Sequence, residues 1–483
     1  MIPNAPGSTP ALPAEAPRWL SWVPPLLAVL GYITILANEF VLDDFHIVVD
    51  NPWVRTGIHF PITEATVTSA GPYYRPFGMF VLSVGYAIWG LWSPGFHAVA
   101  LLQHVVATAL VERVARRLTT PVASIAAAAL FAVHPIHVDA VAPFSNGVEV
   151  LATIFCLLTL LVHCAKPPGS PASPARLGLL NLCFVLALFA KESAVTLLGA
   201  VVLLDAMRPA RVFTLRGALQ LLPALAIYMP LRVHAMGGAT HGMMLDYFEY
   251  LPREIAVHTT LATLWQYVVL LFAPLDLHAD WGRPLIPLYD SMELRPLLGL
   301  VCALSVAAIA LRGLWRPNAV SAGTALFAAG MGLYLHLVPL GPLMAERFTY
   351  WPSVGFCVAV AAATGWLAGR VSSRLPWVLF GSLVLAGLAL TATRCLDWST
   401  PETLWAGEVE RNGTAFAHAN LGAALFARGE RVRAIELLRR AVEMEPTFTA
   451  ARDSLATMLE LENDPAGAAA VRAAAPTPAQ KTP

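Results

Sequence analysis

Charged residues are scarce in this sequence. Asp, Glu, Lys and Arg make up 13% of its 483 residues, whereas about 25% is usual in soluble globular domains. Hydrophobic residues make up 57%, and the mean hydropathy is +0.63. Apolar runs long enough, or nearly long enough, to cross a bilayer recur along the first 392 positions. The composition excludes an ordinary soluble protein and predicts an all-α polytopic membrane protein.

Two further features are missing. The six cysteines show neither a disulfide framework nor a zinc-binding spacing, and most lie in apolar runs, where cysteine behaves as a small hydrophobic residue. Residues 1–18 are rich in Pro and Ala but lack a basic stretch followed by a cleavage site. We therefore expect them to be disordered and cytoplasmic, and the first apolar run to be a retained helix.

The few charges alternate in sign between successive loops. Short cytoplasmic loops concentrate Lys and Arg, so we place the basic clusters inside: Arg113/Arg116/Arg117, Lys166/Arg176, Arg208/Arg211/Arg216, Arg312/Arg316 and Arg370/Arg374. The intervening loops are acidic and rich in His or aromatic residues. This pattern predicts about eleven crossings, with the N-terminus inside and the C-terminus outside. The expected spans are 19–38, 96–114, 120–134, 148–165, 177–190, 194–207, 217–234, 296–312, 319–340, 351–368 and 375–392.

Two other apolar stretches, 76–92 and 256–274, would begin and end on the outer side in this scheme. We interpret them as helices in the outer interface, a position that suits their aromatic residues. If both crossed the membrane instead, Arg116 and Arg117 would lie outside, against the charge rule.

The composition changes after Trp405 to Ala, Arg and Glu. Residues 418–425 (HANLGAAL), followed by Gly429, Ala434, Ala441 and Pro446, have the spacing of a tetratricopeptide repeat, and a weaker unit follows from about Thr449. We predict a membrane domain at 19–392 with a first outer loop at 39–95, a linker at 393–414, a repeat tail at 415–476 and a disordered end at 477–483. The tail either docks on the membrane domain, on a second copy or on a partner, or is a small helical cap without a ligand.

An acidic pair, Asp43 and Asp44, lies a few residues beyond the first apolar run. Carboxylates at a bilayer boundary lose hydration, so they are costly there unless they have a function. A solvated loop is the alternative interpretation.

Several motifs occur in an order typical of a known family. They are 40–44 (FVLDD), 50–52 (DNP), 74–76 (YRP), 95–97 (GFH), 134–141 (HPIHVDAV), 191–193 (KES) and 346–353 (ERFTYWPS). The chain resembles the GT-C glycosyltransferases, and among them the transmembrane and tetratricopeptide repeat-containing protein O-mannosyltransferases, as a bacterial relative. Animal members carry long repeat arrays, whereas this tail has one good repeat.

The resemblance implies a polyprenyl-phosphate sugar donor and assigns roles to residues of the outer loops. Asp43 or Asp44 would be the general base; we favour Asp43, with Asp44 as its partner or as a residue that orients the substrate. Arg347 would bind the donor phosphate, with Arg75 and Lys191 as weaker choices. An ion pair with Glu346 is the alternative for Arg347, and one with Glu192 is the alternative for Lys191.

A second cluster comprises His134, His137, Asp139 and Glu149. A His-x-x-His pair with an acid could hold a metal, but Pro135 lies between the histidines and a third histidine is missing. For this cluster we favour binding of sugar hydroxyls, together with Glu346, or hydrogen bonding within the loop. A divalent metal is the disfavoured alternative, and no cofactor is expected.

The expected function is transfer of a hexose, with mannose favoured, from a polyprenyl phosphate to a hydroxyl on the extracytoplasmic face of a bacterial cytoplasmic membrane. The acceptor is Ser or Thr of a protein, or alternatively a lipid or cell-surface glycan. A transporter of lipid-linked sugars would show internal repetition between halves, which the sequence lacks. Nucleic acid is not an expected partner.

Overall fold

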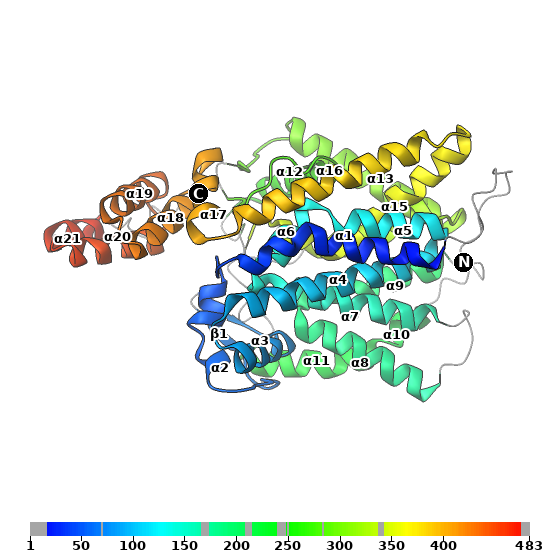
Figure 1. Ribbon diagram of the computed structural model, residues 1–483, viewed down its shortest axis with the longest axis horizontal. Coiled ribbons are helices and arrows are strands. Elements are labelled where there is room, and N and C mark those ends of the chain that lie inside the picture. Colours follow the sequence, from blue (N-terminus) through cyan, green and yellow to red (C-terminus); the bar gives the residue numbers. More distant parts are fainter. Residues whose placement is uncertain are drawn as a thin grey trace.

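The computed structural model describes residues 17–68, 71–165, 173–207, 215–238, 248, 251–282, 285–336 and 342–474. Within them, long helices run side by side in one bundle, and the last helices of the chain extend from one end of it (Figure 1). The disordered ends predicted at 1–18 and 477–483 lie almost wholly outside the described residues, as do Lys166, Arg208 and Arg211 of the basic clusters.

The first part of the bundle is built around α4. Its helices are α1 (Val23–Tyr32), α2 (Pro52–Arg55), α3 (Pro76–Trp89), α4 (Ser93–Leu118), α5 (Pro121–Ala132), α6 (Val138–Val141), α7 (Gly147–Cys164), α8 (Pro174–Ala190), α9 (Leu197–Ala206), α10 (Arg216–Leu219) and α11 (Leu222–Ala235). Helix α4 packs against α1, α5 and α7. Between α2 and α3, β1 (Thr66–Thr68) and β2 (Gly71–Tyr73) form an antiparallel pair in which Thr66 lies opposite Tyr73.

The second part continues with α12 (Arg253–Phe272), α13 (Leu294–Trp315), α14 (Ala319–Met331), α15 (Tyr350–Arg370) and α16 (Leu375–Asp397). Helices α14 and α15 approach most closely at Gly323 and Gly355, where an added Cβ would collide with the backbone of the other helix. Small residues at such crossings allow membrane helices to pack closely.

Short helical turns lengthen or connect these helices. They are η1 (Arg18–Trp22), η2 (Ile33–Ala37), the π-helical turn η3 (Phe45–Val49), η4 (Pro135–His137), η5 (Phe144–Asn146), η6 (Glu192–Thr196), η7 (Gly332–Leu335) and η8 (Glu346–Thr349). Proline in the first turn and a capping hydroxyl set several helix starts: Thr120 caps α5 and Ser173 caps α8.

Seven helices within the described residues are long and apolar enough to cross a membrane: 18–37, 93–118, 144–164, 253–272, 294–315, 346–370 and 375–397. The number rises to eight if the bent pair Pro121–Ala132 and Pro135–Val141 is one span. The chain is therefore a multi-pass membrane protein, as its composition predicted. The predicted spans at 177–190, 194–207, 217–234 and 319–340 correspond to shorter or interrupted helices.

Helix α12 departs from the arrangement predicted for 256–274. It is a continuous helix of 20 residues that meets the length and apolarity of a crossing helix, so these two properties do not mark it as interfacial. The other such segment, α3, is only 14 residues long. It lies beside α2 and β1 at the end of the bundle that carries the C-terminal helices (Figure 1).

The C-terminal helices are α17 (Pro401–Asn412), α18 (Ala415–Ala427), α19 (Arg431–Met444), α20 (Thr449–Leu461) and α21 (Pro465–Ala473). Successive helices pack against each other, and Gly422 lets α18 approach Ala434 and Leu438 of α19. The segment 393–414, expected to be a linker, contains the end of α16 and all of α17, which begins with a capping box at Thr400 and Thr403.

Candidate functional site

The acidic pair lies in the loop that follows η2, at the end of the bundle that carries the tail. Asp44 is completely buried. Its Oδ1 accepts a hydrogen bond from the Ser145 backbone N–H at 2.7 Å, and its Oδ2 accepts one from the Val41 N–H at 3.2 Å. Asp44 therefore connects the loop that follows η2 to the loop before α7.

Asp43 has a different environment. It is partly exposed, and its carboxylate has no hydrogen-bond or ion-pair partner among the described residues, although it lies within electrostatic range of Arg347. The preceding Leu42 has a φ of +54°, which is unfavourable for a bulky residue. Such strain persists only where the surroundings impose it and is common at functional sites. The loop thus buries the Asp44 carboxylate and leaves the Asp43 carboxylate partly exposed.

Burial raises the pKa of Asp44 to about 6, against the opposing effect of the hydrogen bonds from Ser145 and Val41. A pKa above the unfolded value means that the folded protein binds this proton more tightly. The stability that Asp44 contributes is then greatest below about pH 4 and is lost as the pH rises through 6.

We predict that Asp44→Asn flattens this pH dependence. Because a pKa raised from 3.8 to about 6 corresponds to about 3 kcal/mol, the free energy of unfolding of wild type relative to the variant should fall by up to about that amount between pH 4 and 7. Thermal unfolding of both purified proteins across this range measures it. A constant difference between them would contradict the prediction.

Three cations of the predicted site each pair with one acid. The Arg347 Nη1 lies 3.3 Å from Asp139, and Arg75 lies 2.8 Å from Glu192. Lys191 forms a buried ion pair with Glu149. The alternative partners considered from the sequence are therefore wrong: Arg347 pairs with Asp139 rather than Glu346, and Lys191 pairs with Glu149 rather than Glu192.

These pairs adjoin one another. Lys191 Nζ lies 5.0 Å and Arg347 Cζ 5.4 Å from the centroid of the Phe348 ring. Arg75 Cζ lies 5.4 Å from the Tyr73 ring, and Tyr73 is also within electrostatic range of Asp43. The structure thus brings Asp43, Arg75, Lys191 and Arg347 into one cluster.

The electrostatics of the cluster follow from burial and pairing. Burial favours the neutral form of Glu192, but the Arg75 guanidinium outweighs it and lowers the pKa of Glu192. Burial lowers the pKa of Lys191, with Glu149 opposing it. Arg75 and Arg347 retain side-chain exposures of 23% and 18%, compared with 8% for Lys191. The two arginines are therefore the cations that a ligand can reach.

The two histidines proposed for sugar binding are buried in the bundle instead. His134 Nε2 lies 3.0 Å from the Leu271 carbonyl oxygen, and His137 bridges the Phe131 carbonyl oxygen and the Ser353 hydroxyl at 3.0 and 2.8 Å. Both ring nitrogens of each side chain are hydrogen-bonded. These contacts stabilise the bend between α5 and α6. Because every ring nitrogen of the two histidines already has a hydrogen-bond partner, neither side chain is free to bind a sugar.

The acids assigned to sugar binding are partners of other groups. Asp139 accepts the Arg347 backbone N–H at 2.9 Å and the Asn146 amide at 3.1 Å, and Glu149 holds Lys191. Glu346 is fully buried and accepts the His278 N–H at 2.5 Å and the Trp281 indole N–H at 3.0 Å. Asp139 and Glu149 thus each pair with a cation of the cluster, and Glu346 directly precedes Arg347 in the chain.

Sequence reasoning missed Ser145, His278 and Glu408. Ser145 acts through its backbone, which no side-chain pattern reveals. His278 and Glu408 lie 130 residues apart and meet through tertiary contacts. A single histidine three residues before Trp281, in the loop that follows α12, was the available signal for His278.

No family model matches this chain. A protein O-mannosyl-transferase of Caenorhabditis elegans is 25% identical over 448 residues, covering 87% of this chain and 62% of the relative. Tmtc3 of Drosophila melanogaster, a protein O-mannosyl-transferase, is 25% identical over 505 residues, covering 86% of this chain and 54% of the relative. The chain therefore spans between half and two thirds of the length of these curated relatives.

Solved structures show a more distant likeness. The archaeal oligosaccharyltransferase AglB from Archaeoglobus fulgidus, in complex with an inhibitory peptide and a dolichol-phosphate, has a TM-score of 0.47 and 13% identity over 81% of this chain and 57% of its own. ArnT from Cupriavidus metallidurans, bound to undecaprenyl phosphate, has a TM-score of 0.45 and 16% identity over 95% of this chain and 80% of its own. The resemblance indicated by the motifs is confirmed by the two curated relatives, which are both named protein O-mannosyl-transferases.

Proposed function

We propose that this chain is an inverting membrane glycosyltransferase that transfers mannose from a polyprenyl phosphate to Ser or Thr hydroxyls of a protein. The observation that carries the proposal is the placement of Asp43, a carboxylate without a partner among the described residues, in electrostatic range of the reachable cation Arg347. The names of the relatives support the sugar and the acceptor.

Each group has a part in the reaction. Asp43 accepts the proton of the acceptor hydroxyl as its oxygen bonds to the anomeric carbon. The bond from that carbon to the phosphate oxygen breaks, and its electron pair leaves with the phosphate. Arg347 and Arg75 offset the charge that develops there, and arginine suits this because its planar fork matches phosphate oxygens. Attack opposite the leaving phosphate inverts the anomeric centre.

Lys191 has a smaller part in this scheme than the sequence suggested. Its side chain is 8% exposed and paired with Glu149, so a phosphate would have to displace a buried carboxylate to reach it. We assign Lys191 to holding the cluster together. No metal or cofactor takes part in the proposed reaction.

The finer topology belongs to the same proposal. Eleven crossings would use six of the seven long helices together with α5 and the shorter helices α8, α9, α11 and α14. In that scheme α3 lies at the outer face, and so does α12, although α12 is long and apolar enough to cross. The charge cluster then faces the extracytoplasmic side of a bacterial cytoplasmic membrane. Helices α18 to α21 would be a tetratricopeptide-type tail, because their successive packing and small contact residues match that repeat.

Transfer of labelled mannose from a synthetic polyprenyl phosphate tests the function. Purified protein is incubated with this donor and either a Ser/Thr-rich peptide, a lipid acceptor or a glycan acceptor. We expect label in the peptide, with a β-elimination-sensitive linkage. Label in the lipid or glycan alone would keep the donor chemistry and overturn the protein acceptor. Binding of the donor without transfer to any acceptor, or movement of the donor across the membrane of vesicles that contain the protein, would favour transport.

A further inference from the structure

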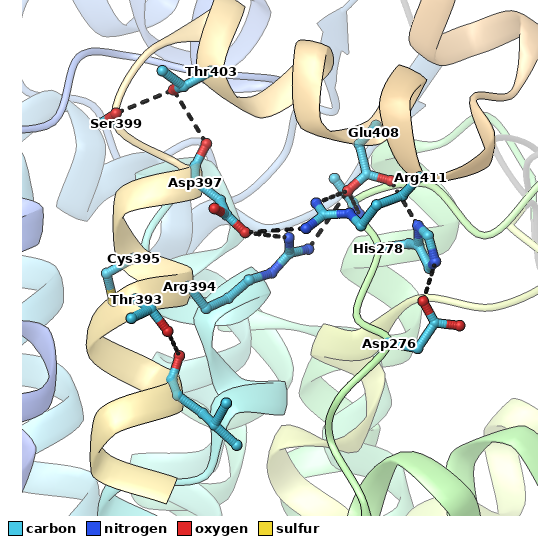
Figure 2. A network of polar contacts seen from close by, with 12 residues as sticks. Asp276, His278, Thr393, Arg394, Cys395, Asp397, Ser399, Thr403, Glu408 and Arg411 are labelled. Carbon is cyan, nitrogen blue, oxygen red and sulfur yellow. Dashed lines mark hydrogen bonds and ion pairs between the residues drawn. The ribbon is translucent and has the colours of Figure 1, made fainter. Parts of the chain in front are cut away.

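A buried polar network joins the first C-terminal helix, α17, to the outer loop that follows α12 (Figure 2). Glu408 of α17 is 2% exposed. Its Oε2 lies 2.9 Å from His278 Nδ1, and its Oε1 accepts the Ala279 backbone N–H at 3.1 Å. The other ring nitrogen of His278 lies 3.0 Å from Asp276.

The membrane helix α16 closes the other side of this network. Arg394 lies 3.7 Å from Glu408 and 3.0 Å from Asp397, and Arg411 of α17 lies 3.2 Å from Glu408. Figure 2 shows both guanidinium groups directed toward these carboxylates. Glu408 is thus held by α16, by α17 and by the loop. A buried carboxylate with this many partners fixes the three segments in one arrangement.

The loop that follows α12 also contacts Glu346, the residue before Arg347 of the charge cluster. The backbone N–H of His278 and the indole of Trp281 both donate to Oε1 of Glu346. Glu346 begins the turn η8 and is followed directly by Arg347, whose own N–H is held by Asp139. Any shift of Glu346 therefore displaces the backbone that carries the Arg347 guanidinium.

We propose that Glu408 and His278 are positioning residues for Arg347, so that docking of α17 on the outer loop sets the geometry of the phosphate-binding arginine. This inference rests on the proposed function, in which Arg347 binds the donor phosphate. Neither residue touches the substrate. Their effect is large because a misplacement of about 1 Å at a reacting centre can lower a rate about 100-fold.

Binding of polyprenyl phosphate to the purified full-length chain tests the inference without requiring an acceptor. The test variant is Glu408→Gln, which keeps the size of the side chain but removes its charge. The control is Glu443→Gln, in an exposed pair with Arg440 on α19. We expect Glu408→Gln to weaken binding about 10-fold and Glu443→Gln to leave it unchanged, with both variants folded by thermal unfolding.

A double-mutant cycle separates positioning from a general loss of stability. With Arg347→Lys as the second change, the effect of Glu408→Gln on binding should shrink to less than about 2-fold, because coupled residues act non-additively. Equal effects in both backgrounds, or unchanged binding in Glu408→Gln, would overturn the inference.

The remaining outcomes are also decisive. If Glu408→Gln does not fold, His278→Asn tests the same link. This substitution replaces the imidazole that contacts Glu408 but keeps the backbone N–H that donates to Glu346. Normal binding by this variant overturns the inference, and weakened binding supports it. Failure of the wild type to bind polyprenyl phosphate would instead overturn the proposed function. The two failures are therefore distinguishable.

Discussion

Asp43→Asn is expected to lower mannosyl transfer by about 100-fold or more, the loss typical of a missing general base. Asparagine keeps the shape of the side chain but cannot accept the proton of the hydroxyl. Binding of the donor should change little, because the carboxylate acts on the acceptor. Initial rates of transfer with saturating donor measure this effect.

Asp50→Asn is the matched control, because Asp50 lies in the same loop and is exposed. We expect it to retain the wild-type rate. Full activity in Asp43→Asn would exclude Asp43 as the base. If Asp44→Asn alone abolished transfer at unchanged stability, the roles of the two acids would be reversed, although the two backbone hydrogen bonds to Asp44 leave it poorly placed to reach an acceptor.

Lys191→Met should destabilise the fold by about 3–5 kcal/mol, because removing one member of a buried ion pair leaves the other uncompensated. Glu149 is 2% exposed and its ion-pair partner is Lys191. The double variant Lys191→Met/Glu149→Gln removes both charges and should recover most of the loss. Thermal unfolding in detergent, compared among the three proteins, gives the result.

A different outcome would reassign Lys191. Unchanged stability of Lys191→Met together with loss of polyprenyl-phosphate binding would mean that the ammonium group binds the donor directly. The comparable substitution at an exposed pair, Arg433→Met beside Glu430, should change stability by less than about 1 kcal/mol.

The sequence by itself determined the class of the protein and the residues of interest. Shortage of charge and repeated apolar runs are properties of composition, and they identified a multi-pass helical membrane protein. The acid pair, Arg75, Lys191 and Arg347 were also recognisable, because they stand in the motifs on which the resemblance to the family rests. The positions of most long helices followed as well, since apolar runs are local signals. Four predicted spans proved to be shorter or interrupted helices, and the expected linker contains α17.

Only the tertiary structure decided which of these residues act on each other. Arg347 and Asp139 are 208 residues apart, and Asp44 and Ser145 are 101 apart. Sequence spacing fixes neighbours along one helix, but the packing of separate helices decides which loops meet at the end of a bundle. That packing paired Arg347 with Asp139 and Lys191 with Glu149, neither of which the sequence predicted. It also buried His134 and His137. Within the described residues it also left the Asp43 carboxylate without a hydrogen-bond or ion-pair partner, because the backbone around it directs Asp44, and not Asp43, into the protein.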